Sequence, residues 1–132
     1  MAHYILDKAY KATDAAGVEA YTVVVHGANA GECRLPTAAN EGKILGVTVH
    51  AQSLQNHSVS VRKAGIARVV AAGAIALGSP VNIAGATGRV QVVGPHASGK
   101  ANCLGFAETA ATAAGDIIEV FISLHERAVA TA

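Results

Sequence analysis

Short apolar runs separated by turn residues are the feature that most restricts how this chain can fold. Each run is a few residues long and is bounded by Gly, Pro or Asn. The runs are Tyr21–His26, Ile44–His50, His57–Arg62, Ile66–Ala71, Val81–Ala84, Arg89–Val93, Cys103–Ala107 and Asp116–Leu124. Runs of this length and spacing are typical of all-β sandwiches and barrels. We therefore predict an all-β chain with a compact barrel-like or sandwich-like body.

The second informative feature is an internal repeat. A shift of 59 residues, which takes Gly46 onto Gly105, aligns one half of the sequence with the other without a gap. The matched positions include Pro36 with Pro95, Leu45 with Leu104, Val59 with Ile118 and Val61 with Val120. This pattern predicts pseudo-repeats at about residues 21–71 and 80–130. Because two copies are too short for a solenoid, we expect them to close on each other as one body.

Residues 1–20 have mixed polarity, and we expect them to form an N-terminal arm or a short helix ahead of a single β-rich domain over residues 21–132. Tyr4, Ile5, Leu6 and Tyr10 stand at a loosely helical spacing. Apolar and aromatic side chains outside a core often anchor interfaces. These four residues are therefore the candidate contacts to a partner or to another copy of the chain. The alternative is that they cover one end of the protein's own barrel.

The composition argues against several classes of partner. Ten basic and nine acidic residues give a net charge of +1 and no basic surface for nucleic acid. Aromatic residues make up only 4% of the chain and Trp is absent, which disfavours a module that stacks bases. The uncharged stretch from Val69 to Gly88 contains Gly and Pro residues that would break a membrane-spanning helix. We expect neither nucleic acid nor membrane as a partner.

The cysteines and histidines follow no disulfide or metal pattern. Cys33 and Cys103 are too few for a disulfide framework and do not match each other in the repeat, so we expect them to fill the core in a reducing compartment. The first residues lack the basic and then apolar layout of a secretion signal. The six histidines have no short spacing to a second ligand. We expect no metal and no cofactor.

The segment Gly94–Lys100 is the sharpest candidate for catalysis. It matches the first seven positions of a phosphate-binding loop, but Ala101 stands where the loop needs a hydroxyl for magnesium. Such a loop also needs a following helix, whereas the repeat predicts a strand here, and we expect a Gly-rich hairpin loop. Ser98 lies near His96 without the frame of a nucleophile elbow. We therefore expect no enzyme, and keep a nucleotide-binding protein as one alternative.

Five segments stand in an order that is informative as a set. The run 63–69 is an Ala-Gly-apolar strand, and Gly78-Ser79-Pro80-Val81 begins the next strand. Three later segments follow: Gly88-Arg89-Val90, Leu104-Gly105-Phe106-Ala107 and Ala113-Ala114-Gly115-Asp116-Ile117-Ile118-Glu119-Val120. Together, over about residues 40–124, these segments resemble successive strands of the small head decoration, or capsid cement, proteins of tailed bacteriophages, with Ser79 in a usually acidic place.

The resemblance implies a virion structural protein that is made in the host cytoplasm and sits on the outer face of an icosahedral head. It also implies a compact β-rich body, commonly a homotrimer, that reinforces contacts between major capsid protein subunits. A carbohydrate-binding β module on the virion surface is a further alternative. Carbohydrate-binding sites usually contain exposed aromatic side chains, however, and this sequence has few aromatic residues.

Overall fold

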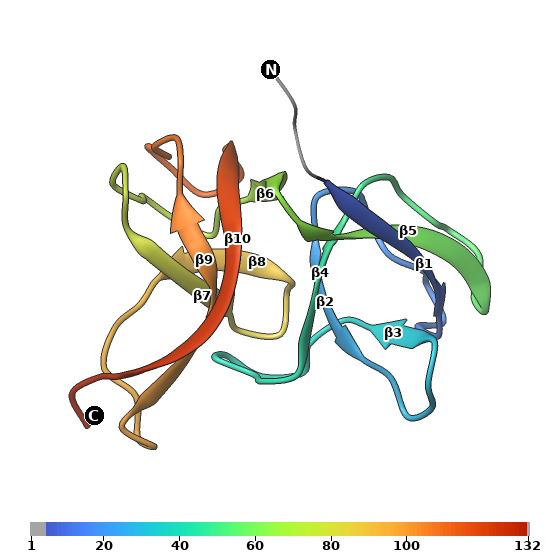
Figure 1. The fold of residues 1–132 in the computed structure, drawn as a ribbon, viewed down its shortest axis with the longest axis horizontal. Coiled ribbons are helices and arrows are strands. Elements are labelled where there is room, and N and C mark those ends of the chain that lie inside the picture. The colour runs from blue at the N-terminus through green and yellow to red at the C-terminus, as the bar shows by residue number, and fades with distance from the viewer. Residues whose placement is uncertain (1–4, 132) are drawn as a thin grey trace.

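The computed structural model describes residues 5–131, and every regular element in that range is a β-strand (Figure 1). The all-β prediction is confirmed. The strands are β1 (Leu6–Ala12), β2 (Val23–His26), β3 (Glu32–Arg34), β4 (Ile44–Thr48), β5 (His57–Ala64), β6 (Ile66–Val70), β7 (Pro80–Ala84), β8 (Arg89–Val92), β9 (Lys100–Ala107) and β10 (Ile117–Ala128). The described residues contain no helix that is long and apolar enough to cross a membrane.

Strands β1 to β5 form a closed barrel in the order β1-β3-β2-β4-β5. Strand β1 closes the barrel because it pairs parallel with β3 and antiparallel with β5. The interior is filled by side chains from all five strands, namely Tyr10, Ala12, Val24, Cys33, Leu45, Val59 and Val61, together with Val18 from a connecting segment. Closure leaves this half without a free strand edge.

Strand β1 is a departure from the arm or short helix expected over residues 1–20. Tyr10 and Ala12 are buried in the barrel, whereas Lys11 between them is exposed. Side chains two residues apart share a face of a strand, so this alternation fits β1 and not the helical spacing of the candidate residues. The division of the chain into an arm and a single domain stays a prediction.

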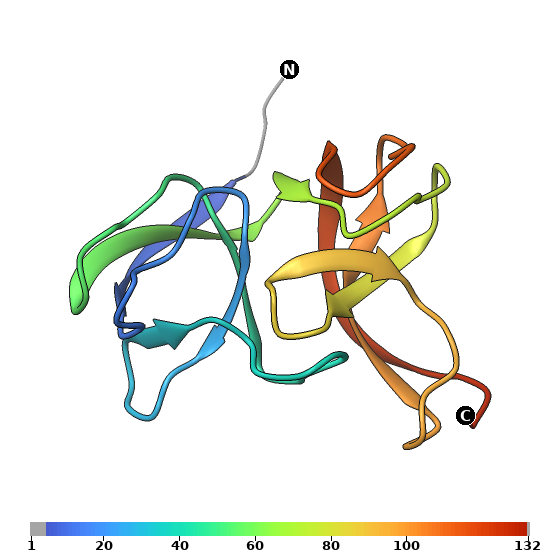
Figure 2. The same cartoon turned by 180° about the vertical axis from the view of Figure 1, so that it is seen from behind.

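Strands β6 to β10 form a second sheet in the order β6-β10-β9-β7-β8. The 59-residue shift places β1 on β6, β2 on β7, β3 on β8, β4 on β9 and β5 on β10. Even the parallel pairing of β1 with β3 has a counterpart in a single parallel bridge between Ala71 and Val90. Each half of the repeat thus forms its own sheet (Figures 1 and 2), and the boundaries near residues 21 and 80 stay a prediction.

The two halves share a core. Val23, Val25 and Val47 face out of the barrel and belong to the same buried cluster as the interior of the second sheet. The second-sheet members of that cluster include Val69, Ile83, Leu104, Ile118 and Val120. Burial of each such side chain contributes about 1.5–3 kcal/mol, so the contact between the halves is an integral part of the stability of the chain.

The paired glycines of the repeat have one structural cause. Gly46 on β4 and Gly105 on β9 each lie against the backbone of the next strand. A Cβ at Gly46 would overlap the carbonyl oxygen of Arg62, and a Cβ at Gly105 would overlap that of Phe121. Arg62 and Phe121 are themselves one repeat apart, so the same close approach occurs in both halves and only glycine fits it.

Candidate interaction surface

The candidate contact residues near the N-terminus fall into different environments. Tyr4 lies outside the described residues. Ile5 and Leu6 are exposed at the start of β1, Leu6 to 57%. Tyr10 is only 4% exposed, and its hydroxyl accepts a hydrogen bond of 2.7 Å from the ammonium group of Lys63. Tyr10 is therefore part of the barrel interior, and Ile5 and Leu6 are the side chains of this set that the structure places at the surface.

The Gly94–Lys100 segment does not have the geometry of a phosphate-binding loop. Lys100 begins strand β9, so no helix N-terminus follows the loop. The loop also differs from the expected hairpin, because it links β8 and β9, which lie on opposite sides of β7. The Ser98 hydroxyl lies 2.8 Å from Nδ1 of His96, and the backbone N–H of His96 donates to the carbonyl of Ala130. These contacts bind the loop to itself and to the C-terminal segment.

The cysteines have the environment of core residues. Cys33 and Cys103 are both buried and unbridged. Burial raises the pKa of the Cys33 thiol to about 11, with a further contribution from the charge of Asp14. Burial likewise raises the pKa of Cys103. Both thiols therefore stay protonated at neutral pH, and a protonated thiol is neither a nucleophile nor a metal ligand.

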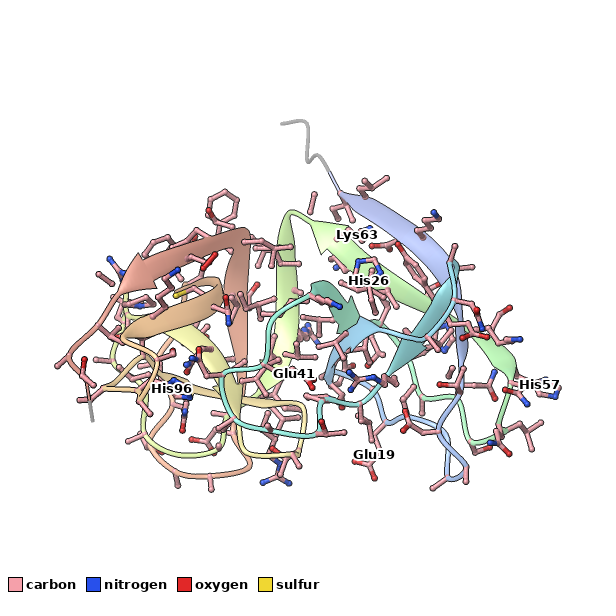
Figure 3. The ribbon with its side chains drawn as sticks, turned by 90° about the horizontal axis from the view of Figure 1, so that it is seen from below. Glu19, His26, Glu41, His57, Lys63 and His96 are labelled. Atoms are coloured by element: carbon pink, nitrogen blue, oxygen red, sulfur yellow. The ribbon has the colours of Figure 1, made fainter. Side chains whose placement is uncertain are left out.

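The histidines are dispersed over the molecule. Figure 3 shows His26 and His57 at separate places on the barrel and His96 on the second half. Among residues 5–131 no group of three or more His, Cys, Asp or Glu side chains could hold a metal ion.

A cluster of three asparagines joins the two halves. The side-chain oxygen of Asn40 accepts hydrogen bonds from Nδ2 of Asn82 (3.0 Å) and from the backbone N–H of Asn102 (2.8 Å). Its Nδ2 group donates to the carbonyl of Lys100 at 2.8 Å. Asn40 is buried and has a left-handed backbone, with φ of 58°. It therefore fixes the loop before β4 onto strands β7 and β9, a structural role that the sequence did not reveal.

Three apolar side chains on neighbouring strands lie side by side on the outer face of the second sheet, and Ile117 is exposed further along β10. Ile66 on β6 lies opposite Phe121 on β10, and Phe121 lies opposite Phe106 on β9. Ile66 is 43% exposed and Phe121 47% exposed, and Phe106 is half-buried under the stacked ring of His125. We call Ile66, Phe121 and Phe106 the apolar row. It contains both phenylalanines of the chain.

The sequence contained part of the signal for this row. Alternation along β10 places Phe121 on the face opposite to Ile118 and Val120, which are buried. A single exposed phenylalanine needs no explanation, whereas a contiguous exposed apolar row marks an interaction surface. The neighbours that make it a continuous row depend on the register between β6, β10 and β9, which the repeat alone did not give.

Comparisons with known proteins add a match of fold. No protein-family model and no curated protein sequence matches the chain. Among solved structures, the chain is similar to the N base of the head fiber protein gp8.5 of bacteriophage phi29, with a TM-score of 0.65 and 17% sequence identity. The match covers 91% of this chain and 95% of that chain. The two chains share their fold, and the expected likeness to phage head decoration proteins is thereby met at the level of the fold.

Proposed function

We propose that this chain is a virion structural protein that binds the outer surface of an icosahedral phage head and reinforces the contacts between major capsid protein subunits. The observation that carries the proposal is the shared fold over nearly the whole chain with the base of a phage head fiber. The ordered series of sequence segments that resemble the decoration family supports the same role independently. The protein acts by binding and is not an enzyme.

The proposed mechanism is physical. A protein that binds the assembled shell but not the separated subunits stabilises the shell by mass action. Several copies joined in a ring would bind neighbouring sites together, which raises the overall affinity without any new contact at each site. A closed homotrimer would match a local threefold axis of the shell.

The start of β1 is the proposed contact to the capsid. Ile5 and Leu6 expose apolar side chains there, and Tyr4 precedes them in the sequence. The strand behind them is held in place, since Asp7 forms a 2.9 Å ion pair with the guanidinium group of Arg62 on β5. Exposed apolar side chains on a fixed strand can dock without a large loss of conformational entropy.

The test is cosedimentation of the purified chain with heads assembled from the cognate major capsid protein. We expect the protein to pellet with expanded heads and to remain in the supernatant with free capsid subunits. The variant Leu6→Asp should lose most of the head binding. The matched control is Leu54→Asp, because Leu54 is equally exposed at 56% and lies before β5, whereas Leu6 is paired with the last residue of β5.

Two results would overturn the proposal. Absence of the wild-type protein from the head pellet at micromolar concentration would remove capsid binding as the function. Equal loss of binding in Leu6→Asp and Leu54→Asp would remove the start of β1 as the contact, because a general change in charge would then explain both.

A further inference from the structure

The apolar row has an exact counterpart by position in the first half of the chain. Phe106 and Phe121 are paired as Val47 and Arg62 are, one repeat earlier. Ile66 and Phe121 are likewise paired as Asp7 and Arg62 are. The two outer faces can therefore be compared residue for residue, because the register of both pairs is the same.

In the first half, the second half of the same chain covers only the Val47 end of this face, whereas Asp7 stays exposed. Val47 is only 1% exposed and lies in the shared core together with Ala67 of β6. The guanidinium group of Arg62 donates to the carbonyl of Ile66, and the carbonyl of Tyr21 accepts from the backbone N–H of Val70. A unit of this fold thus packs against the outer face of another such unit within one chain.

In the second half, the matching face carries apolar side chains, and within residues 5–131 Ile66 and Phe121 stay 43% and 47% exposed. The ion pair between Asp7 and Arg62 is replaced there by Ile66 and Phe121. An ion pair at a half-exposed site is compatible with water, whereas neighbouring Ile and Phe side chains gain free energy when water is excluded. Replacement of the ion pair by Ile66 and Phe121 therefore favours a face that is covered by another protein surface in an assembly.

The border of the row indicates what kind of surface covers it. Arg68 and Glu119 lie opposite each other on the same outer face, next to Ile66 and Phe121. On this side of the row the border therefore carries one positive and one negative charge. A border with both signs is complementary to another copy of itself, whereas a partner of a single sign would meet repulsion from one of the two groups.

We propose that the apolar row of Ile66, Phe121 and Phe106 is the surface through which one copy of this chain packs against a second copy. This inference deepens the proposed function and rests on it for the role of the assembly, which is to join copies that bind the capsid together. The packing of one half against the other inside the chain is the structural precedent for the contact.

The experiment installs the ion pair of the first half at the matched positions of the second. The double variant Ile66→Asp with Phe121→Arg should fold, because the same pair of residues stands in the same register in the barrel. We would measure the mass in solution by light scattering after size exclusion and by analytical ultracentrifugation over a wide concentration range. Circular dichroism and thermal unfolding would verify that the variant is folded.

We expect the wild type to form an oligomer and the folded double variant to sediment as a 13.2 kDa monomer, with the apparent dissociation constant raised at least about tenfold. The control Leu77→Asp changes an exposed leucine outside the row and should leave the oligomer intact. A wild type that is monomeric throughout, or a double variant that keeps the oligomer, would overturn the inference.

The outcome is separable from that of the capsid proposal. A folded double variant that stays oligomeric but fails to pellet with heads would assign the row to the capsid contact and contradict self-association. A wild type that forms the oligomer through the row but ignores heads would leave this inference standing and remove the proposed function.

Discussion

Substitution of Gly105 by alanine tests the reason for the repeated Leu-Gly pair. Strand β9 lies between β10 and β7 and is hydrogen-bonded to both. A Cβ at Gly105 would overlap the carbonyl oxygen of Phe121 and also come too close to the backbone nitrogen of Ser123. The strand cannot move away from β10 without being driven into β7, so the ladder on one side must open.

The magnitude follows from these contacts. Overpacking of a tight site costs about 1–3 kcal/mol, and loss of one ladder hydrogen bond adds about 1 kcal/mol. The lower entropy of an alanine in the unfolded chain offsets about 0.4–1 kcal/mol. The net loss in the free energy of unfolding is therefore about 2 kcal/mol, which for a chain of this size lowers Tm by roughly 8 °C.

The assay is thermal and urea unfolding of three variants followed by circular dichroism. Gly46→Ala should behave like Gly105→Ala, since it meets the carbonyl oxygen of Arg62 in the same way. Gly73→Ala is the matched control, because a Cβ there meets nothing within 4 Å and the residue is not among those with positive φ. A Gly105→Ala protein that melts within about 2 °C of Gly73→Ala would refute the close-approach explanation.

Three further predictions concern other parts of the structure. Asn40→Gly keeps the left-handed backbone but removes the side-chain hydrogen bonds to Asn82, Asn102 and Lys100. Calorimetry should therefore show that the free energy of unfolding falls by about 2–4 kcal/mol. An unchanged Tm would contradict the proposed link between the two halves. Hydrogen bonds from Thr112 and Ala113 lower the pKa of Asp116, so the ionised Asp116 carboxylate stabilises the folded protein above its unfolded pKa, and this stabilisation is lost as pH falls through its folded pKa. The difference in Tm between the wild type and Asp116→Asn should therefore narrow from pH 7 to pH 2. A difference that stays constant would exclude this charge effect. Cys33, with a pKa raised to about 11 by burial, should react with a thiol reagent at pH 8 only after unfolding, and rapid labelling of the folded protein would contradict its burial.

The strands that the sequence predicted are those with dense apolar runs. The segments around Val59, Val61, Ile118 and Val120 were readable because alternation and the repeat agreed there. Strand β3 was missed because it is three residues long and Cys33 is its single apolar side chain, which is too short for a period to show. Strand β1 was missed because it has only Tyr10 and Ala12 on its buried face, amid charged neighbours.

The candidate surface was only partly predictable for a different reason. Exposure of Ile5 and Leu6 and burial of Tyr10 depend on which strands lie beside β1, and the pairing of β1 with β3 is a contact between segments about twenty residues apart. The apolar row needs the register of three strands. Single-sequence patterns give the faces of each strand, whereas the neighbours across strands come from tertiary structure.

Cryo-electron microscopy of heads incubated with the purified chain would show directly whether the protein covers the shell. We predict additional density on the outer face of the shell, at the junctions between major capsid protein subunits, into which this fold fits with the start of β1 toward the capsid. Heads without added density at saturating protein concentration, or density confined to the inner face, would contradict this prediction.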